Sequence, residues 1–262
     1  YKPRLKNGHS FDAMVGWTIQ GDQFNRFGLT GENLPNETLN IYGLEEGIPG
    51  ANTATMQESM VISYLGRVNY SLKDKYLFTA SLRADGSSKF ASNNRWSYFP
   101  SAAFAWKITN EDFMKNISFI DDAKLRTSYG LTGNNRIDPY AIFSQMTLPY
   151  SAYYSFGDKV SQGITLSSFG NKSLKWETTE QVDIGLDLSL FKQRINITAD
   201  WYKKTTKDLL LRANVPYSSG YPTIYKNIGK VGNQGFEFSL STVNIKGKSF
   251  KWESDFNISF NN

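Results

Sequence analysis

The segment 181–202 contains two stretches in which apolar and polar residues alternate, and this pattern constrains the fold more than any other feature of the chain. The apolar members of the two stretches are Val182, Ile184, Leu186, Leu188 and Leu190, followed by Ile195, Ile197, Ala199 and Trp201. Alternation with period two predicts strands, and the short connection at 191–194 predicts an antiparallel hairpin. A transmembrane strand needs about 9–11 such residues, apolar toward lipid and polar toward the lumen. The hairpin therefore favours a transmembrane β-barrel.

The same alternation predicts nine strands along the chain. They lie at 11–20, 60–71, 76–85, 97–108, 123–132, 176–190, 194–206, 235–244 and 250–260. Short connections at 72–75, 191–193 and 245–249, and a medium one at 109–122, alternate with long ones at 21–59, 86–97, 133–175 and 207–234. Outer-membrane barrels have short periplasmic turns and long extracellular loops. We therefore expect an all-β fold, a partial antiparallel transmembrane barrel.

Composition narrows the classes of protein that the chain can belong to. No run of 18 or more apolar residues occurs, so a helical membrane protein is not expected. The chain has no cysteine and a single histidine, His9, so disulfides, thiolate metal sites and histidine clusters are not expected. The net charge of +5 is dispersed, without the basic patch of a nucleic-acid-binding protein. We predict no metal, no cofactor and no nucleic-acid partner.

Acidic residues on the polar strand faces raise the possibility of catalysis. Asp183 and Asp187 share a strand face, and a glycoside hydrolase needs two carboxyl groups about 5–10 Å apart. Charged residues of both signs also suit a water-filled or plugged barrel lumen, and no nucleophile, base and orienting group cluster in the sequence. The sequence therefore predicts that the chain is not an enzyme. A soluble carbohydrate-binding β-sandwich and a passive porin remain alternatives at this point.

Several sequence blocks, in a fixed order, carry a resemblance to a known family. They are Tyr70–Tyr76, Arg83–Phe90, Asn94–Ser101, Leu125–Asn134, Leu174–Thr179, Ser219–Tyr221 and Asn227–Glu237. In this order and spacing they resemble the later part of the barrel of SusC/RagA-type TonB-linked outer-membrane proteins. The resemblance covers about residues 60–262. Lys172 after Asn171, and Val182, depart from the residues common in the family.

The resemblance implies most of what we expect of function. Residues 1–262 would be a partial TonB-dependent receptor barrel, without the plug domain and the closing strands, located in the cell outer membrane. The full protein would import a bulky nutrient, an oligosaccharide or a peptide, with energy delivered by TonB through the missing plug region. A SusD-like surface lipoprotein would act as its lid, and outer-membrane lipid would surround it.

Aromatic residues are the candidate ligand contacts. Tyr150, Tyr153, Tyr154 and Phe156 lie in the long loop 133–175, where aromatic faces could stack on sugar rings or contact a peptide. They could equally pack the loop onto itself or onto a partner protein. Tyr217, Tyr221 and Tyr225 in the loop 207–234 have the same two interpretations. The tryptophans near strand ends, among them Trp176 and Trp201, fit an interfacial belt or local packing.

Overall fold

The computed structural model describes residues 8–262 apart from 37, 149–152 and 222, and its main feature is one antiparallel sheet of nine long strands. The strands are β1 (His9–Gly28), β4 (Thr53–Leu72), β5 (Tyr76–Ser87), β6 (Trp96–Lys107), β7 (Ile120–Asn134), β12 (Glu177–Leu190), β13 (Ile195–Lys207), β16 (Lys230–Lys246) and β17 (Lys251–Asn261). Each long strand pairs with the next one along the chain. The nine predicted strands are therefore confirmed, in a simple meander.

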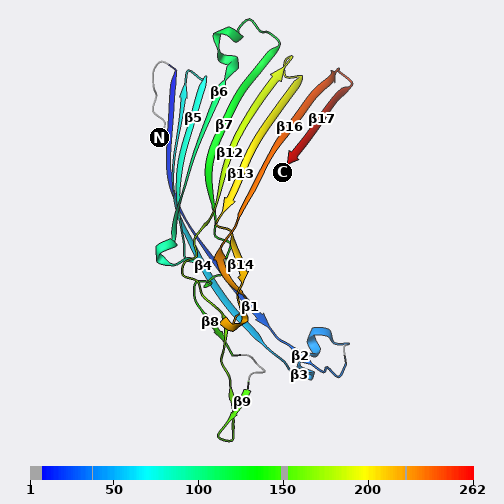
Figure 1. Cartoon of the computed structure of the whole chain (residues 1–262). Coiled ribbons are helices and arrows are strands. Elements are labelled where there is room, and N and C mark those ends of the chain that lie inside the picture. Colours follow the sequence, from blue (N-terminus) through cyan, green and yellow to red (C-terminus); the bar gives the residue numbers. More distant parts are fainter. Residues whose placement is uncertain (1–7, 37, 149–152, 222) are drawn as a thin grey trace.

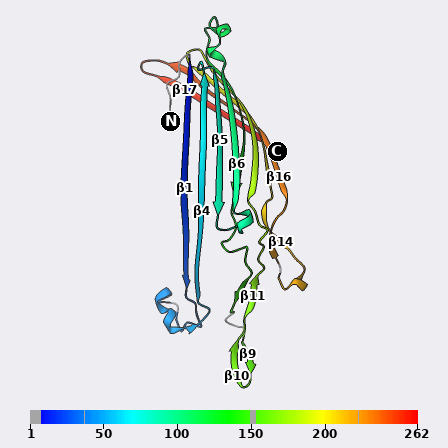
Figure 2. The ribbon, with the colours of Figure 1, turned by 90° about the vertical axis from the view of Figure 1, so that its left-hand side faces the viewer.

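The connections divide by length between the two ends of the sheet (Figures 1 and 2). Short turns join the strands at one end, and the long connections project from the other. The long connections contain small hairpins: β2 (Gly31–Glu32) with β3 (Ile48–Pro49), β8 (Gln145–Thr147) with β11 (Thr165–Ser168), β9 (Tyr153–Phe156) with β10 (Lys159–Gln162), and β14 (Leu210–Asn214) with β15 (Thr223–Asn227). The short 3-10 helices in the described part of the chain are η1 (Asn40–Glu46), η2 (Ser92–Asn94), η3 (Ile108–Asn110), η4 (Asp112–Met114) and η5 (Tyr217–Ser219). We call the two ends the turn rim and the loop rim.

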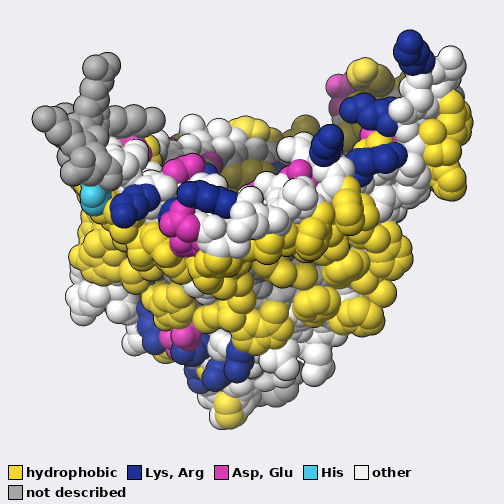
Figure 3. Space-filling view, turned by 90° about the horizontal axis from the view of Figure 1, so that it is seen from above, with side chains coloured by type: hydrophobic (Ala, Val, Ile, Leu, Met, Phe, Trp, Pro, Cys, Tyr) yellow, Lys and Arg dark blue, Asp and Glu magenta, His cyan; other side chains and the backbone are white. Residues whose placement is uncertain are grey.

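The register separates the two faces of the sheet. Leu186 lies beside Leu125 and Ala199, and Ala199 lies beside Phe238, so an apolar row crosses four strands on one face. One residue further along, Gly185 lies beside Arg126 and Asp200, and a polar row crosses the same strands on the other face. Figure 3 shows the hydrophobic side chains gathered in a broad band, with charged side chains at its margins.

The apolar face has no covering layer. Many of its large side chains are exposed, among them Trp17, Tyr64, Phe78, Ile184, Phe236 and Ile258. No second sheet of comparable size is formed by the described residues, so the two-sheet core of a β-sandwich is not built. Within the described part of the chain, no helix is long and apolar enough to cross a membrane. The geometry is that of a barrel wall whose apolar face meets lipid.

The strands β1 and β4 are longer than their sequence pattern predicts. The sequence pattern predicts strands at 11–20 and 60–71 with a loop between them, whereas the pairing of β1 with β4 continues to Gly28 opposite Thr53. The strand β5 pairs with β4 only from Val61 onward. The remaining residues, 53–60 of β4 and 21–28 of β1, form a two-stranded ribbon that extends about 25 Å past the rest of the sheet. Apolar and polar residues do not alternate cleanly there, because neither face of the ribbon is buried.

A carboxylate fastens the turn rim. Glu111, between η3 and η4, accepts hydrogen bonds from Lys75 Nζ at 2.8 Å, the Tyr76 hydroxyl at 2.7 Å and Trp106 Nε1 at 3.1 Å. These hydrogen bonds lower the pKa of Glu111 to about 2. The bond from Lys75 has the largest effect, followed by those from Tyr76 and Trp106. These bonds hold the connection between β6 and β7 against the hairpin β4–β5.

Candidate functional site

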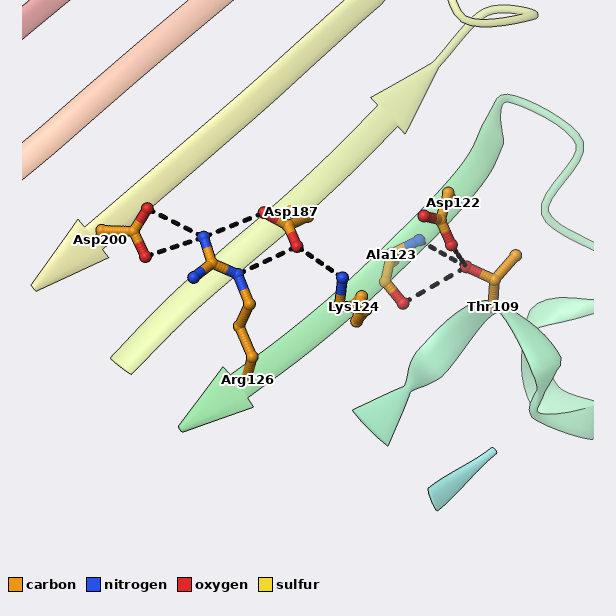
Figure 4. Close-up of polar contacts among 7 residues, drawn as sticks. All are labelled: Thr109, Asp122, Ala123, Lys124, Arg126, Asp187 and Asp200. Atoms are coloured by element: carbon orange, nitrogen blue, oxygen red, sulfur yellow. Dashed lines mark hydrogen bonds and ion pairs between the residues drawn. The ribbon is translucent and has the colours of Figure 1, made fainter. Parts of the chain in front are cut away.

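The polar face carries an ion-pair network that spans three adjacent strands (Figure 4). Arg126 on β7 donates from Nε to Asp187 Oδ2 at 3.0 Å, and its Nη2 reaches Asp200 Oδ2 on β13 at 2.9 Å. Lys124, on the same face of β7, lies 3.0 Å from Asp187 Oδ2. The four side chains are about a quarter to a third exposed, so water reaches them only in part. The network ties β7, β12 and β13 together across the lumen face.

The strand between Arg126 and Asp200 contributes Gly185, and the absence of a side chain there is essential. A Cβ at Gly185 would lie 2.2 Å from Asp200 Oδ1 and 2.6 Å from Arg126 Cζ. The guanidinium therefore crosses directly over the backbone of β12 to reach the second carboxylate. The carboxylates Asp183 and Asp187 do share this face, as the sequence predicts, but Asp187 is held in ion pairs. Asp183 accepts hydrogen bonds from Ser128 and Gln181.

A compact apolar cluster lies at the loop rim, and we call it the loop core. Its buried members are Phe90, Phe99, Ile137, Ala141, Ile142, Leu174, Trp176 and Leu210. Phe90 and Leu174 are completely buried, and Trp176 is only 7% exposed. The sequence blocks at 83–90, 94–101 and 174–179 thus meet in space, although each block was recognised separately. The connections that follow β5, β7 and β13 all share this core.

Polar contacts around the loop core join the same segments. Trp176 Nε1 donates to the backbone carbonyl of Arg95 at 2.9 Å, so this tryptophan serves packing rather than an interfacial belt. Asn135 Nδ2 donates to the buried Ser87 hydroxyl at 3.1 Å. Asn171 Nδ2 donates to the carbonyl of Tyr225 at 2.8 Å, and links the connection 135–176 to the hairpin β14–β15. The external connections are therefore anchored to the barrel wall and to one another.

A cleft of about 310 Å³ lies between the connection 135–176 and the hairpin β14–β15. Arg212 Nη2 contacts Asp138 Oδ2 at 2.8 Å, the Tyr225 hydroxyl donates to the same oxygen at 2.9 Å, and the guanidinium lies 4.9 Å from the centre of the Tyr225 ring. The pKa of Arg212 is raised, mainly by its side-chain hydrogen bond with Tyr225 and then by that with Asp138. The rest of the lining is neutral and mixed: Gln57, Gln145, Ser167, Ser168 and Thr223 are polar, and Pro139, Ala141, Phe169 and Ile224 are apolar. The cleft volume is at the lower end of the range for small-ligand sites, about 300–1,000 Å³.

The predicted aromatic ligand contacts are only partly together. Tyr153, Tyr154 and Phe156 all lie on β9, and each is at least half exposed, at 53%, 55% and 76%. Because successive residues of a strand point to opposite faces, Tyr154 and Phe156 share one face and Tyr153 lies on the other. Tyr150 falls outside the described residues. The hairpin β9–β10 projects beyond the loop core, at the far end of the molecule in Figures 1 and 2. That these residues bind a ligand remains a prediction.

The other loop tyrosines divide differently. Tyr221 is buried, with Phe169 packed edge-on at 5.5 Å, which supports the packing interpretation. Tyr225 lines the cleft. No sequence pattern indicates that Asp138 and Arg212 are partners, because they lie 74 residues apart and their pairing depends on how two irregular connections fold. Among the described residues, no cluster of three or more potential metal ligands occurs.

The fold and this arrangement define a sector of a transmembrane antiparallel barrel with structured external loops. The family of TonB-dependent receptor-like β-barrels matches residues 3–262. The chain therefore belongs to the TonB-dependent receptor β-barrel family, whose SusC/RagA-type members are outer-membrane proteins. It is a piece of an outer-membrane barrel.

Relatives of known name agree with this assignment. The TonB-dependent receptor SusC of Bacteroides thetaiotaomicron is 38% identical over 259 residues, with 97% of this chain and 25% of the relative covered. TonB-dependent receptor P3 of Formosa agariphila is 37% identical over 254 residues, with the same coverage. The solved structure of the RagAB peptide transporter superposes on this chain with a TM-score of 0.87 and 28% sequence identity. The superposition covers 100% of this chain and 28% of the transporter chain. The chain thus spans about a quarter of the length of the curated relatives it matches.

Proposed function

We propose that the full-length protein containing this chain is an active importer of a bulky nutrient, an oligosaccharide or a peptide, across the outer membrane. The observation that carries the proposal is the match of the whole chain to the barrel of the RagAB peptide transporter, with a TM-score of 0.87. The plug domain, the segment that contacts TonB and the closing strands belong, in this proposal, to the part of the protein outside these 262 residues. The function involves no covalent chemistry.

The proposed partners follow from the same similarity. TonB supplies energy through the plug, and a SusD-like surface lipoprotein covers the loop rim as a lid. The structure supports a role for the loop rim in binding, because the loop core fixes the external connections on the wall. A ligand or lid that contacts these loops meets a preformed surface, so less conformational entropy is lost on binding.

The hairpin β9–β10 provides the first test. Replacing Tyr154 and Phe156 together by Ala removes the aromatic face that they share, and we expect slower growth on the cognate nutrient or loss of the co-purifying lipoprotein. Val160→Ala, on the paired strand β10, is the matched control, since Val160 is also exposed, at 75%, but has no aromatic face. Surface quantification of folded barrel must be unchanged in both variants. Normal growth and normal co-purification in the double variant would assign these aromatics to loop packing alone.

Import itself is tested separately. Deleting the full-length gene should abolish uptake of the nutrient, and dissipating the proton gradient should stop uptake in the wild type. Uptake that continues without a proton gradient would indicate a passive pore and would contradict the proposal.

A further inference from the structure

The lipid-facing side of the wall changes from apolar to basic at one level near the loop rim. On β13 the residues of this side are Ile195, Ile197, Ala199 and Trp201, and then Lys203, Thr205 and Lys207. The apolar part covers about 23 Å of strand, which rises only about 16–19 Å across the membrane at the usual strand tilt of about 35–45°. Trp201 is the last apolar residue of this side and has the amphipathic ring typical of the membrane interface. Lys203 therefore lies at the edge of the apolar band on the side of the long loops, Lys207 lies beyond it, and both side chains are long enough to reach the headgroup layer.

The neighbouring strands change at the same level. Lys203 lies beside Val182 and Gln234, and Lys207 lies beside Thr178 and Lys230. Immediately below, Trp201 and Phe236 are paired and about two-fifths exposed, as expected of aromatic residues at a membrane interface. The strand β13 has neighbours on both sides along its whole length, so Lys203 lies inside the sheet. The strand β17 pairs with β16 only from Gly235 onward, so Lys230 lies on a part of β16 that has one neighbour among the described residues.

The charges at this level are not balanced among the described residues. We call Lys203, Lys207, Lys230 and Glu180 the rim cluster. Glu180 binds Lys207 Nζ at 2.8 Å and accepts a hydrogen bond from the Tyr129 hydroxyl at 3.2 Å. Neither Lys203 nor Lys230 forms an ion pair or a side-chain hydrogen bond with another described residue, and both are exposed. The cluster thus carries an excess of two positive charges toward the headgroup layer.

The apolar surface below the rim cluster is hollowed. Ala80 and Ala102 are neighbours on β5 and β6, and the larger side chains of Phe78, Phe104 and Tyr129 surround them. The groove has a volume of about 470 Å³, and Val182 extends its lining to the strand that carries Glu180. A chain-like apolar occupant in the groove would place its polar end near the rim cluster.

We propose that the rim cluster and the groove form a binding site for a phosphate-bearing lipid of the outer leaflet. Lys203 and Lys230 bind the headgroup phosphate, and the groove receives an acyl chain. An ammonium group at the membrane surface is attracted to anionic lipid and contributes about fivefold to its binding. The occupant is a lipid because the site lies on the face that meets the bilayer, directly above its hydrocarbon.

The test uses the full-length protein in nanodiscs of phosphatidylcholine that contain a small fraction of phosphatidic acid. Native mass spectrometry counts the phosphatidic acid that stays bound when the protein is released. We expect Lys203→Gln with Lys230→Gln to lower retention about tenfold or more, since two lysines are lost. The double substitution by Arg should retain the lipid because it keeps both charges.

Lys204 provides the matched control. It follows Lys203 on the same strand but lies on the lumen face, beside Gln181 and Asn233. Lys204→Gln should therefore leave retention unchanged, and millimolar inorganic phosphate should not displace the lipid. Equal retention in the double Gln variant, an equal loss in Lys204→Gln, or displacement by free phosphate would overturn the proposal. Heat-modifiable gel mobility confirms that each variant is folded.

Discussion

Gly185 permits the lumen network by having no side chain, and it gives the sharpest prediction at the scale of single residues. Gly185→Ala places a Cβ within 2.6 Å of both the Arg126 guanidinium and the Asp200 carboxylate. The arginine must then move and lose charge-assisted hydrogen bonds, each worth about 1.5–3 kcal/mol. We expect the unfolding free energy of the full-length barrel to fall by about 2 kcal/mol or more, measured by denaturant titration.

Gly66 is the control for this change, because it lies on β4 in the interior of the same sheet but on the lipid face. No atom lies within 4 Å of a Cβ built at Gly66. Gly66→Ala should therefore leave stability nearly unchanged. Equal effects of the two substitutions would show that the network does not depend on the gap at Gly185.

The lowered pKa of Glu111 predicts that the stability of the folded protein depends on pH. Its pKa falls from the ordinary value near 4.5 to about 2 in the folded protein, so the folded state binds fewer protons than the unfolded state between these values. The stabilisation is fully present above about pH 4.5 and is lost as the pH falls toward 2. The difference in melting temperature between the wild type and Glu111→Gln should shrink over that range.

The neighbouring Asp112 serves as the comparison for Glu111. It pairs with Lys115 at 2.6 Å, but both side chains are at least 70% exposed, and such a pair contributes little to stability. Asp112→Asn should leave the melting temperature nearly unchanged between pH 2 and pH 7. A difference for Glu111→Gln that does not change with pH would mean that its carboxylate is not what holds the rim.

At the scale of strands and loops, sequence periodicity predicted the long strands well and the loops poorly. The alternation at 182–190 reports which face meets lipid, so the period and the register are both constrained. The ribbon of β1 and β4 lacks that constraint, and its sequence pattern therefore predicts a loop instead of strands. The loop core and the cleft depend on contacts between residues far apart in sequence, such as Asn171 with Tyr225, and no local pattern encodes such contacts.

The assignment of the two faces can be tested on neighbouring strands. Leu186→Arg places a charge on the lipid face, at a cost of about 2–4 kcal/mol near the midplane. Ser239→Arg, on β16, is the control, because Leu186, Ala199 and Phe238 form one row and Ser239 follows Phe238. Two strand spacings at the usual tilt change the depth along that row by only about 6 Å. Ser239 lies on the lumen face, where arginine remains hydrated. Folded full-length barrel, measured by heat-modifiable gel mobility, should fall only for Leu186→Arg, and an equal loss for both would contradict the assignment.

For the molecule as a whole, the fold explains how one sheet serves two environments. The apolar face meets lipid, the polar face is cross-linked by ion pairs, and the loop rim carries the structured surface that we propose binds ligand and lid. All three depend on the claim that this sheet is a wall of a transmembrane barrel. The 262 residues contain no cysteine, so spin labels can be attached at single introduced cysteines within this chain.

The most direct measurement is the accessibility of spin labels along β16 in the full-length protein, reconstituted in bilayers and free of other reactive thiols. Labels at Phe236, Phe238 and Leu240 should collide frequently with oxygen, which concentrates in lipid, and rarely with a water-soluble nickel chelate. Labels at Ser239 and Ser241, on the opposite face, should show low oxygen accessibility. A two-residue period in the oxygen signal is the result that this account predicts. Equal oxygen accessibility at all five positions, or high nickel accessibility at the three apolar ones, would contradict it.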